Sequence, residues 1–323
     1  MVTPVIAAPR QSRTVFERLR GGDEVAYAVT CFFALLVLVL TGALLWGLWV
    51  HSDLTRQKFG FGFVTSTTWN PGDADQYGAL PFIYGTLLTS FLALLISVPL
   101  GVGAAIFLSE LAPAKLSNAL TFLVELLAAV PSVIYGLLAI FTLVPLMRNF
   151  IEPALKKAFG FLPLFQGPIF GVGYLTAGVI LSVMTFPFII SVSREALMAV
   201  PREQREAALA LGATQWESTF QVVLPFAKLG IIGSIFLGLA RALGETMAVT
   251  MVIGNNPAIH ASLLSPGYTI AAVIANEFTE ATSDVHLSAL VELGLVLFVL
   301  TIVVNGLAQL LIVLTTNKGS AKS

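Results

Sequence analysis

Long apolar stretches recur along the chain, each close to the length needed to cross a membrane. A segment that crosses hydrocarbon is helical, because its backbone polar groups must be hydrogen-bonded internally, and it needs about 20 consecutive apolar residues to span a core about 30 Å thick. The six stretches cover residues 26–50, 82–108, 119–147, 169–192, 229–254 and 286–314. They predict an all-α polytopic membrane protein with six transmembrane helices.

The first stretch follows a tail, residues 1–25, that contains four arginines and superficially resembles a secretory signal. A signal-peptide core has only about 7 to 15 apolar residues, so 26–50 is expected to be a retained helix. Residues 51–80 are rich in Gly, Thr, Trp and Asp and predict an irregular loop outside the membrane. The remaining five helices form a core at 81–315, followed by a short tail, 316–323. Within that core, 268–282 has helical apolar spacing and predicts an amphipathic helix covering the outer surface.

Composition agrees with a bilayer protein and excludes several other classes. Of 323 residues, 57% are hydrophobic and only 11% are charged, and the mean hydropathy is +0.90, which leaves too few polar groups to cover a soluble surface. A net charge of −1 provides no basic stripe for nucleic acid. The lone Cys31 and the three histidines have neither catalytic-triad nor metal-ligand spacing. No catalytic residue and no metal site is therefore expected.

The distribution of Lys and Arg predicts the orientation, because basic residues concentrate on the cytoplasmic side of a membrane. With a cytoplasmic amino terminus, 11 of the 17 basic residues lie inside, 5 lie outside and Arg241 falls within a helix. The inside set is Arg10, Arg13, Arg18, Arg20, Lys115, Arg194, Arg202, Arg205, Lys228, Lys318 and Lys322, and the outside set is Arg56, Lys58, Arg148, Lys156 and Lys157. Both termini are therefore expected in the cytoplasm.

The loop 193–228 between the fourth and fifth helices contains residues that are typical of helix starts and ends. Pro201 suits a helix start, and Gly212 can adopt the left-handed conformation that ends a helix. A second short helix is expected from Gln215 to Val223, stopped by Pro225. By itself this pattern predicts a projecting helix-turn-helix, which could be either a solvated loop or a surface for another protein.

Glu206-Ala207-Ala208, followed by Gly212 and Leu224-Pro225, resembles the EAA loop of ABC importer permeases. The resemblance implies a type I permease core of five helices at 81–315, with Glu206, Ala207, Ala208 and Gly212 docking a separate ATPase. It also implies that ATP and Mg are bound by that partner. A phosphate-binding G-x-x-x-x-G-K-[ST] loop needs a Gly-Lys pair, and the chain contains none.

Arg241 and Glu245 are charges within the fifth apolar stretch. An isolated charge at the centre of a membrane helix costs about 2.5 to 3.5 kcal/mol, so we expect the two residues, four apart, to pair on one helical face toward the bundle. Arg241 could bind a tetrahedral oxyanion while Glu245 orients it, or the two could form a structural ion pair. Glu125 and Glu292 are further acids within apolar stretches and are expected to be buried.

Residues 241–246 (Arg-Ala-Leu-Gly-Glu-Thr) and the run from Glu125 to Gly136 are similar to the permeases of phosphate importers. The continuation Met247-Ala248-Val249 is similar to the PstC type among the two related permeases of such systems. This resemblance implies a substrate pathway at Arg241 and Glu245, with Glu125, Pro131 and Ser132 as gate or pathway support. The implied partners are a PstA-like permease, a PstB-like ATPase dimer and a PstS-like phosphate-binding protein, at a bacterial cytoplasmic membrane.

Three alternatives stay open at this point. The anion could be sulfate, molybdate or phosphonate, because an arginine fork binds any of them. An ion-coupled secondary transporter could use Glu125, Glu245 and Glu292 as cation sites, although it leaves the 193–228 loop unexplained. A regulatory role in phosphate sensing is compatible with transport.

Overall fold

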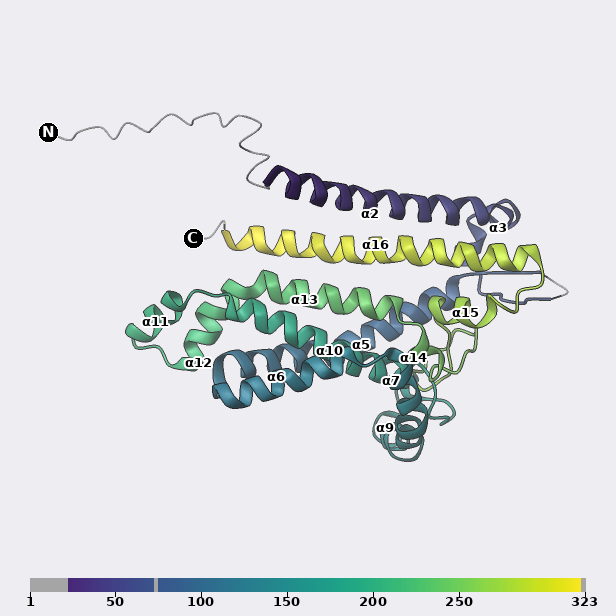
Figure 1. The fold of residues 1–323 in the computed structure, drawn as a ribbon. Coiled ribbons are helices and arrows are strands. Elements are labelled where there is room, and N and C mark those ends of the chain that lie inside the picture. The colour runs from purple at the N-terminus through teal and green to yellow at the C-terminus, as the bar shows by residue number, and fades with distance from the viewer. Residues whose placement is uncertain (1–22, 73–74, 321–323) are drawn as a thin grey trace. The chain divides into compact units, whose positions relative to one another are not determined.

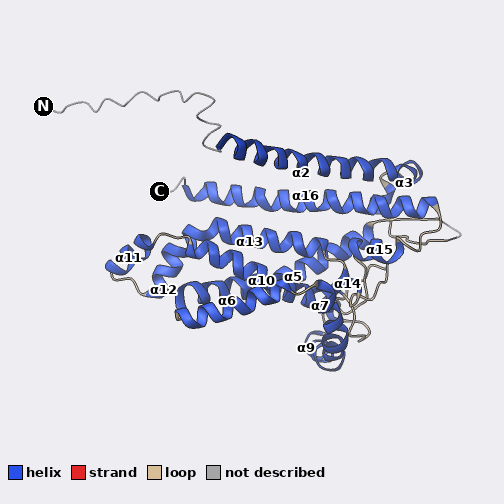
Figure 2. Cartoon of the chain, viewed as in Figure 1, coloured by secondary structure: helices blue, strands red, loops and turns tan. Residues whose placement is uncertain are grey.

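A computed structural model of the chain describes residues 23–72 and 75–320, and this part contains helices but no strand (Figure 2). The tail residues 1–22 and 321–323, with Arg10, Arg13, Arg18, Arg20 and Lys322, lie outside the described residues. The helices are α2 (Asp23–His51), α3 (Asp53–Phe59), α4 (Gly62–Thr65), α5 (Leu80–Ile106), η1 (Phe107–Leu111), α6 (Ala114–Ala129), α7 (Ser132–Leu138), η2 (Ala139–Leu143), α8 (Val144–Leu146), η3 (Met147–Ile151), α9 (Glu152–Phe159), η4 (Pro163–Phe165), α10 (Tyr174–Met198), α11 (Arg202–Ala210), α12 (Gln215–Ser218), η5 (Thr219–Val223), α13 (Leu224–Gly244), α14 (Met247–Thr250), α15 (Ile270–Glu277) and α16 (Asp284–Ser320).

Six helical segments among the described residues are long and apolar enough to cross a membrane, which confirms the expected fold class. They span Glu24–His51, Leu80–Leu111, Ser132–Phe159, Tyr174–Met198, Gln215–Gly244 and Asp284–Leu310. The chain divides into two compact units, with the boundary between Val50 and His51. The first unit consists, in its described residues, of helix α2, whose apolar side chains are almost all exposed.

The second unit is built around α10, which packs against α5 and α13 (Figure 1). Glycines let these helices approach closely, as is usual where packing rather than water drives association. A Cβ added at Gly101 of α5 would lie 2.8 Å from Cγ2 of Ile189 in α10. The largest core cluster lies where α5, α7, α10 and α14 meet, and includes Tyr135, Tyr174 and Met184.

The third apolar stretch differs from its predicted form. Helix α6 ends at Ala129, Val130 and Pro131 are extended, and α7 starts at Ser132. The ring of a proline disfavours the helical conformation of the preceding residue, which accounts for the break. The expected burial of Glu125 in this stretch is wrong: α6 packs against α10 and η1, and Glu125 is exposed.

The two segments expected near the membrane surface contain helices that pack on the bundle. Residues 51–80 begin with α3 and α4 rather than an irregular loop, and α3 packs against α16. The backbone N–H of Thr55 donates to Oγ of Ser288 across this contact at 3.2 Å. Helix α15 is shorter than the predicted amphipathic helix and packs on α5, α14 and α16. Glu292 of α16 is buried, as expected.

Candidate functional site: a surface loop and a half-buried arginine

Helices α11 and α12 form the predicted helix-turn-helix at one end of the second unit (Figure 1). Pro201 is the residue immediately before α11. Gly212 follows the helix with φ +88°, and no atom would lie within 4 Å of an added Cβ. Glycine is therefore favoured at this position by the left-handed backbone and not by a lack of space for a side chain. Thr214 begins α12 with a capping box, in which its side chain and backbone exchange hydrogen bonds with Glu217.

The predicted docking residues lie together on this loop. Glu206, Ala207 and Gly212 are exposed, and Ala208 is half-buried. Two large apolar side chains accompany them: Leu211 is 90% exposed and Trp216 is 57% exposed. Both lie on the same charged loop as the predicted docking residues.

The prediction that Pro225 stops the second helix is wrong. The helix continues without interruption from Gln215 to Gly244. Before the proline, the backbone widens into the π-helical turn η5, in which the N–H of Leu224 donates to the carbonyl of Thr219 five residues back. A π turn makes room where a proline ring would otherwise clash with the preceding helical turn.

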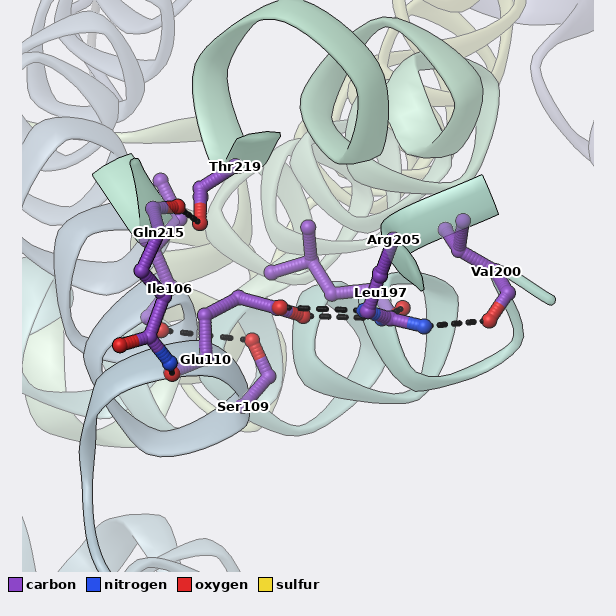
Figure 3. A network of polar contacts seen from close by, with 8 residues as sticks. All are labelled: Ile106, Ser109, Glu110, Leu197, Val200, Arg205, Gln215 and Thr219. Atoms are coloured by element: carbon purple, nitrogen blue, oxygen red, sulfur yellow. Dashed lines mark hydrogen bonds and ion pairs between the residues drawn. The ribbon is translucent and has the colours of Figure 1, made fainter. Parts of the chain in front are cut away.

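Arg205 of α11 holds the loop against the ends of two long helices (Figure 3). Its Nε donates to Oε2 of Glu110 at 3.1 Å, and its Nη2 donates to Oε1 of the same carboxylate at 2.9 Å. The remaining guanidinium donors reach the backbone carbonyls of Leu197 and Val200. Gln215 adds a bond from Nε2 to the carbonyl of Glu110 at 3.0 Å. We refer to the pair Glu110 and Arg205 as the clamp.

Arg241 and Glu245 lie at the other candidate site, but not as the predicted pair on one helical face. Helix α13 ends at Gly244, and Glu245 has an extended backbone with ψ 127°. Oε1 of Glu245 accepts from the backbone N–H of Ala248 at 3.4 Å, at the start of α14. In the part of the chain that the structure describes, no ion pair joins the two side chains. The negative carboxylate instead lies at the start of α14, where it interacts favourably with the positive end of the helix dipole.

The guanidinium of Arg241 lies over an aromatic ring from another helix. Its Cζ is 4.3 Å from the ring centroid of Phe188 in α10. Its Nε is shielded from solvent and has no hydrogen-bond acceptor. Tyr135 of α7 lies close enough to Arg241 to interact with its charge. The Tyr135 hydroxyl donates to the carbonyl of Leu127, across the break between helices α6 and α7.

The remaining predicted site residues line that break. Pro131 is the residue before α7, and Ser132 is the first residue of the helix, one turn before Tyr135. The sequence analysis named Pro131 and Ser132 as gate or pathway support without identifying Tyr135 or Phe188. Tyr135 lies in the run from Glu125 to Gly136 that carried the family resemblance, whereas no local pattern marks Phe188.

A family model described as "Binding-protein-dependent transport system inner membrane component" matches residues 97–312. The chain belongs to this family of membrane-embedded transporter subunits. The matched region starts within α5 and extends into α16, so it includes both the α11–α12 loop and Arg241.

Curated relatives are similar over almost the whole chain. A "Phosphate transport system permease protein PstC" of Mesorhizobium japonicum is 45% identical over 313 residues, covering 95% of each chain. The protein of the same name from Pasteurella multocida is 48% identical, covering 91% of this chain and 92% of that one. A "Probable phosphate transport system permease protein PstC" of Methanocaldococcus jannaschii is 37% identical over 293 residues. Within its family, the chain groups with the PstC-type permeases.

Solved structures share the fold. A chain of a bacterial alginate ABC transporter, crystallised with an alginate pentasaccharide-bound periplasmic protein, aligns with a TM-score of 0.58 at 18% identity, covering 92% of this chain and 96% of that chain. A chain of the MetNI methionine ABC transporter in an inward facing conformation aligns with a TM-score of 0.50 at 20% identity, covering 72% and 93%. At these identities the likeness concerns the fold alone.

Proposed function

We propose that this chain is the permease subunit of an ABC importer that moves inorganic phosphate across the bacterial cytoplasmic membrane. The observation that carries the proposal is the identity of 45% and 48%, over more than nine-tenths of each chain, to two permeases named for phosphate transport. The fold supplies the setting, with six helices of membrane-spanning length. The chain is a non-catalytic subunit in this proposal, because it lacks a Gly-Lys phosphate loop.

The α11–α12 loop faces the cytoplasm in this proposal. The excess of Lys and Arg on its side of the membrane supports that orientation, with both termini on the same side. An ATPase dimer of the PstB type docks there and hydrolyses ATP with Mg. The exposed Glu206, Ala207 and Gly212, with Leu211 and Trp216 beside them, supply a mixed charged and apolar surface for it.

The translocation pathway runs between this chain and a second, PstA-like permease, and a PstS-like binding protein delivers phosphate from outside. Arg241 serves the pathway in this proposal. Its guanidinium carries the N–H donors that fit phosphate oxygens, and Phe188 holds its plane from one side. Glu245 caps α14 close by and limits how tightly an anion can bind, as release from a carrier requires.

Reconstitution of the four-component complex in proteoliposomes tests the function. We expect uptake of labelled phosphate that requires binding protein outside and ATP inside. Unlabelled arsenate should compete, whereas sulfate and molybdate should not. Preferential uptake of another oxyanion would overturn the substrate assignment, and uptake driven by an ion gradient without ATP would overturn the class.

Glu206→Lys tests the docking surface in the same vesicles. A reversed charge in the centre of the loop should abolish uptake while binding-protein recognition is retained. Lys157→Gln, an exposed change outside the loop, is the control and should transport normally. If Glu206→Lys transported phosphate at the normal rate, ATPase docking through this residue would be wrong.

A further inference from the structure

The clamp is one of the attachments of helix α11 to the bundle. None of its residues is buried, so no apolar side chain of its own anchors it in a core. It packs against η5 and is tied elsewhere by the side chain of Arg205. The side chain of Glu110, in η1 directly after α5, is only 8% exposed, and that of Arg205 is 22% exposed. Bidentate bonds in such a shielded place are among the stronger polar contacts that proteins form.

The clamp joins helices that are distant in sequence. Glu110 ends the segment formed by α5 and η1, Leu197 belongs to the last turn of α10, and Arg205 lies 95 positions from Glu110 (Figure 3). An apolar cluster holds the ends of α5 and α10 together with η5 and α13, without α11: Ala105, Ile106, Leu197, Val200, Val223, Ala227 and Ile231. Ser117 of α6 adds a bond from Oγ to the carbonyl of Leu108 at 2.7 Å.

We propose that the clamp transmits the movement of α11 to α5 and α10. The proposal rests on the docking of an ATPase at the α11–α12 loop. The covalent chain connects α11 to α10 through residues 199–201 and to α13 through α12, but it provides no direct connection to α5. Through Glu110, a displacement of α11 moves the end of α5 together with α10. Arg205 and Glu110 are thus positioning residues, distinct from the surface that the ATPase contacts.

The geometry requires arginine in particular. A guanidinium can bind both carboxylate oxygens in one plane and still reach two carbonyls, whereas an ammonium is a single point charge. Arg205→Lys should therefore preserve the charge but loosen the link. Removing the clamp should leave α11 able to bind the ATPase, because its exposed residues are unchanged, while its movement is no longer passed on efficiently. We therefore expect the variants to hydrolyse ATP but to transport less phosphate per ATP than the wild type.

The test measures phosphate uptake and ATP hydrolysis together in proteoliposomes that contain the complete complex. We expect Arg205→Gln and Glu110→Gln each to lower the phosphate moved per ATP by about fivefold or more, the scale of an ordinary coupling free energy. Arg205→Lys should fall between these variants and the wild type. The ATPase should still copurify with every variant. Lys115→Gln, an exposed change in the nearby α6, should keep the wild-type ratio.

Several outcomes would overturn the transmission role. One is a wild-type ratio of phosphate moved per ATP in both Arg205→Gln and Glu110→Gln. Another is an equal loss of uptake and hydrolysis, because the clamp would then act only in assembly or folding. If Arg205→Gln failed to assemble, Arg205→Lys would decide, and a wild-type ratio there would reject the proposal. Failure of the proposed function itself is separate, since the wild-type complex would then show no ATP-driven phosphate uptake.

Discussion

The guanidinium of Arg241 lies over the ring of Phe188, from another helix, with its carbon 4.3 Å from the ring centroid. We expect Arg241→Lys to reduce phosphate uptake by about tenfold or more, equivalent to about 1.4 kcal/mol, because lysine lacks the planar fork. Arg241→Gln should be lower still. Proteoliposome uptake measures this, with Lys157→Gln as control. Wild-type uptake by Arg241→Gln would remove Arg241 from the pathway.

Substitution of Phe188 should reduce phosphate uptake less than substitution of Arg241. A stacked cation and ring contribute about 0.5 to 2 kcal/mol, so Phe188→Leu should raise the substrate concentration for half-maximal uptake severalfold. Phe188→Tyr keeps a ring and should remain close to wild type. Uptake rates over a range of phosphate-loaded binding protein give this value. An identical response of the Leu and Tyr variants would mean that the ring face is unimportant.

Gly101 and Gly103 make a matched pair within α5. A Cβ at Gly101 would lie 2.8 Å from Ile189, whereas nothing lies within 4 Å of one at Gly103. We expect Gly101→Ala to destabilise the protein by about 1 to 3 kcal/mol through overpacking and Gly103→Ala to have little effect or to stabilise it slightly. Thermal unfolding in detergent distinguishes them. Equal midpoints would contradict the close contact between α5 and α10.

Gly212 should be sensitive for a different reason. Because its φ is +88° with free space around it, Gly212→Ala should cost about 1 kcal/mol through backbone strain alone, and Gly212→Asn should cost less. The expected result is faster proteolysis within the α11–α12 loop and weaker ATPase copurification. Gly233→Ala, which meets nothing within 4 Å in α13, is the control. Normal copurification by Gly212→Ala would show that the turn tolerates other conformations.

Trp216 should contribute to ATPase docking through its exposed ring. It packs against Phe220 with centroids 4.3 Å apart and is exposed beyond that contact. Aromatic anchors of this kind often contribute 2 kcal/mol or more to an interface, by alanine substitution, so Trp216→Ala should weaken ATPase binding by about tenfold or more. Surface plasmon resonance with purified ATPase measures it. Exposed Phe161→Ala, away from the loop, should bind normally.

Tyr77 predicts an alkaline pH dependence of stability. Burial, together with the hydrogen bond from its hydroxyl to Asp75, raises the pKa of Tyr77 to about 12 from 10.0. The folded state therefore favours the protonated phenol, and this stabilisation is full below pH 10 and is lost as the pH rises through 12. The stability difference between wild type and Tyr77→Phe should shrink across that range. A pH-independent difference would contradict a raised pKa.

The sequence predicted the helices better than their ends. Apolar length largely determines where a chain can cross a membrane, so five of the six predicted stretches match candidate spans closely, whereas the third, 119–147, is broken at Val130 and Pro131 and the span there is Ser132–Phe159. The ends depend on local backbone choices: Glu245 lies beyond α13, and Pro225 lies within a continuous helix because a π turn accommodates it. The spacing of apolar residues along a sequence does not reveal such local changes of backbone conformation.

The candidate sites divide in the same way. Glu206, Ala207, Ala208 and Gly212 lie together because they are neighbours in sequence, so a local motif could identify them. The clamp could not be predicted, because Glu110 and Arg205 are separated by 95 positions and belong to no common pattern. The stacking of Arg241 on Phe188 likewise depends on how α10 and α13 pack.

The unbroken helix from Gln215 to Gly244 has a mechanical consequence. At 1.5 Å per residue, its 30 residues make a shaft about 45 Å long, with Trp216 near one end and Arg241 near the other. Its one π turn, at Thr219–Val223, lies close to the Trp216 end. Long helices bend preferentially at such turns. A force applied at Trp216 therefore reaches this bending point before the rest of the helix that leads to Arg241.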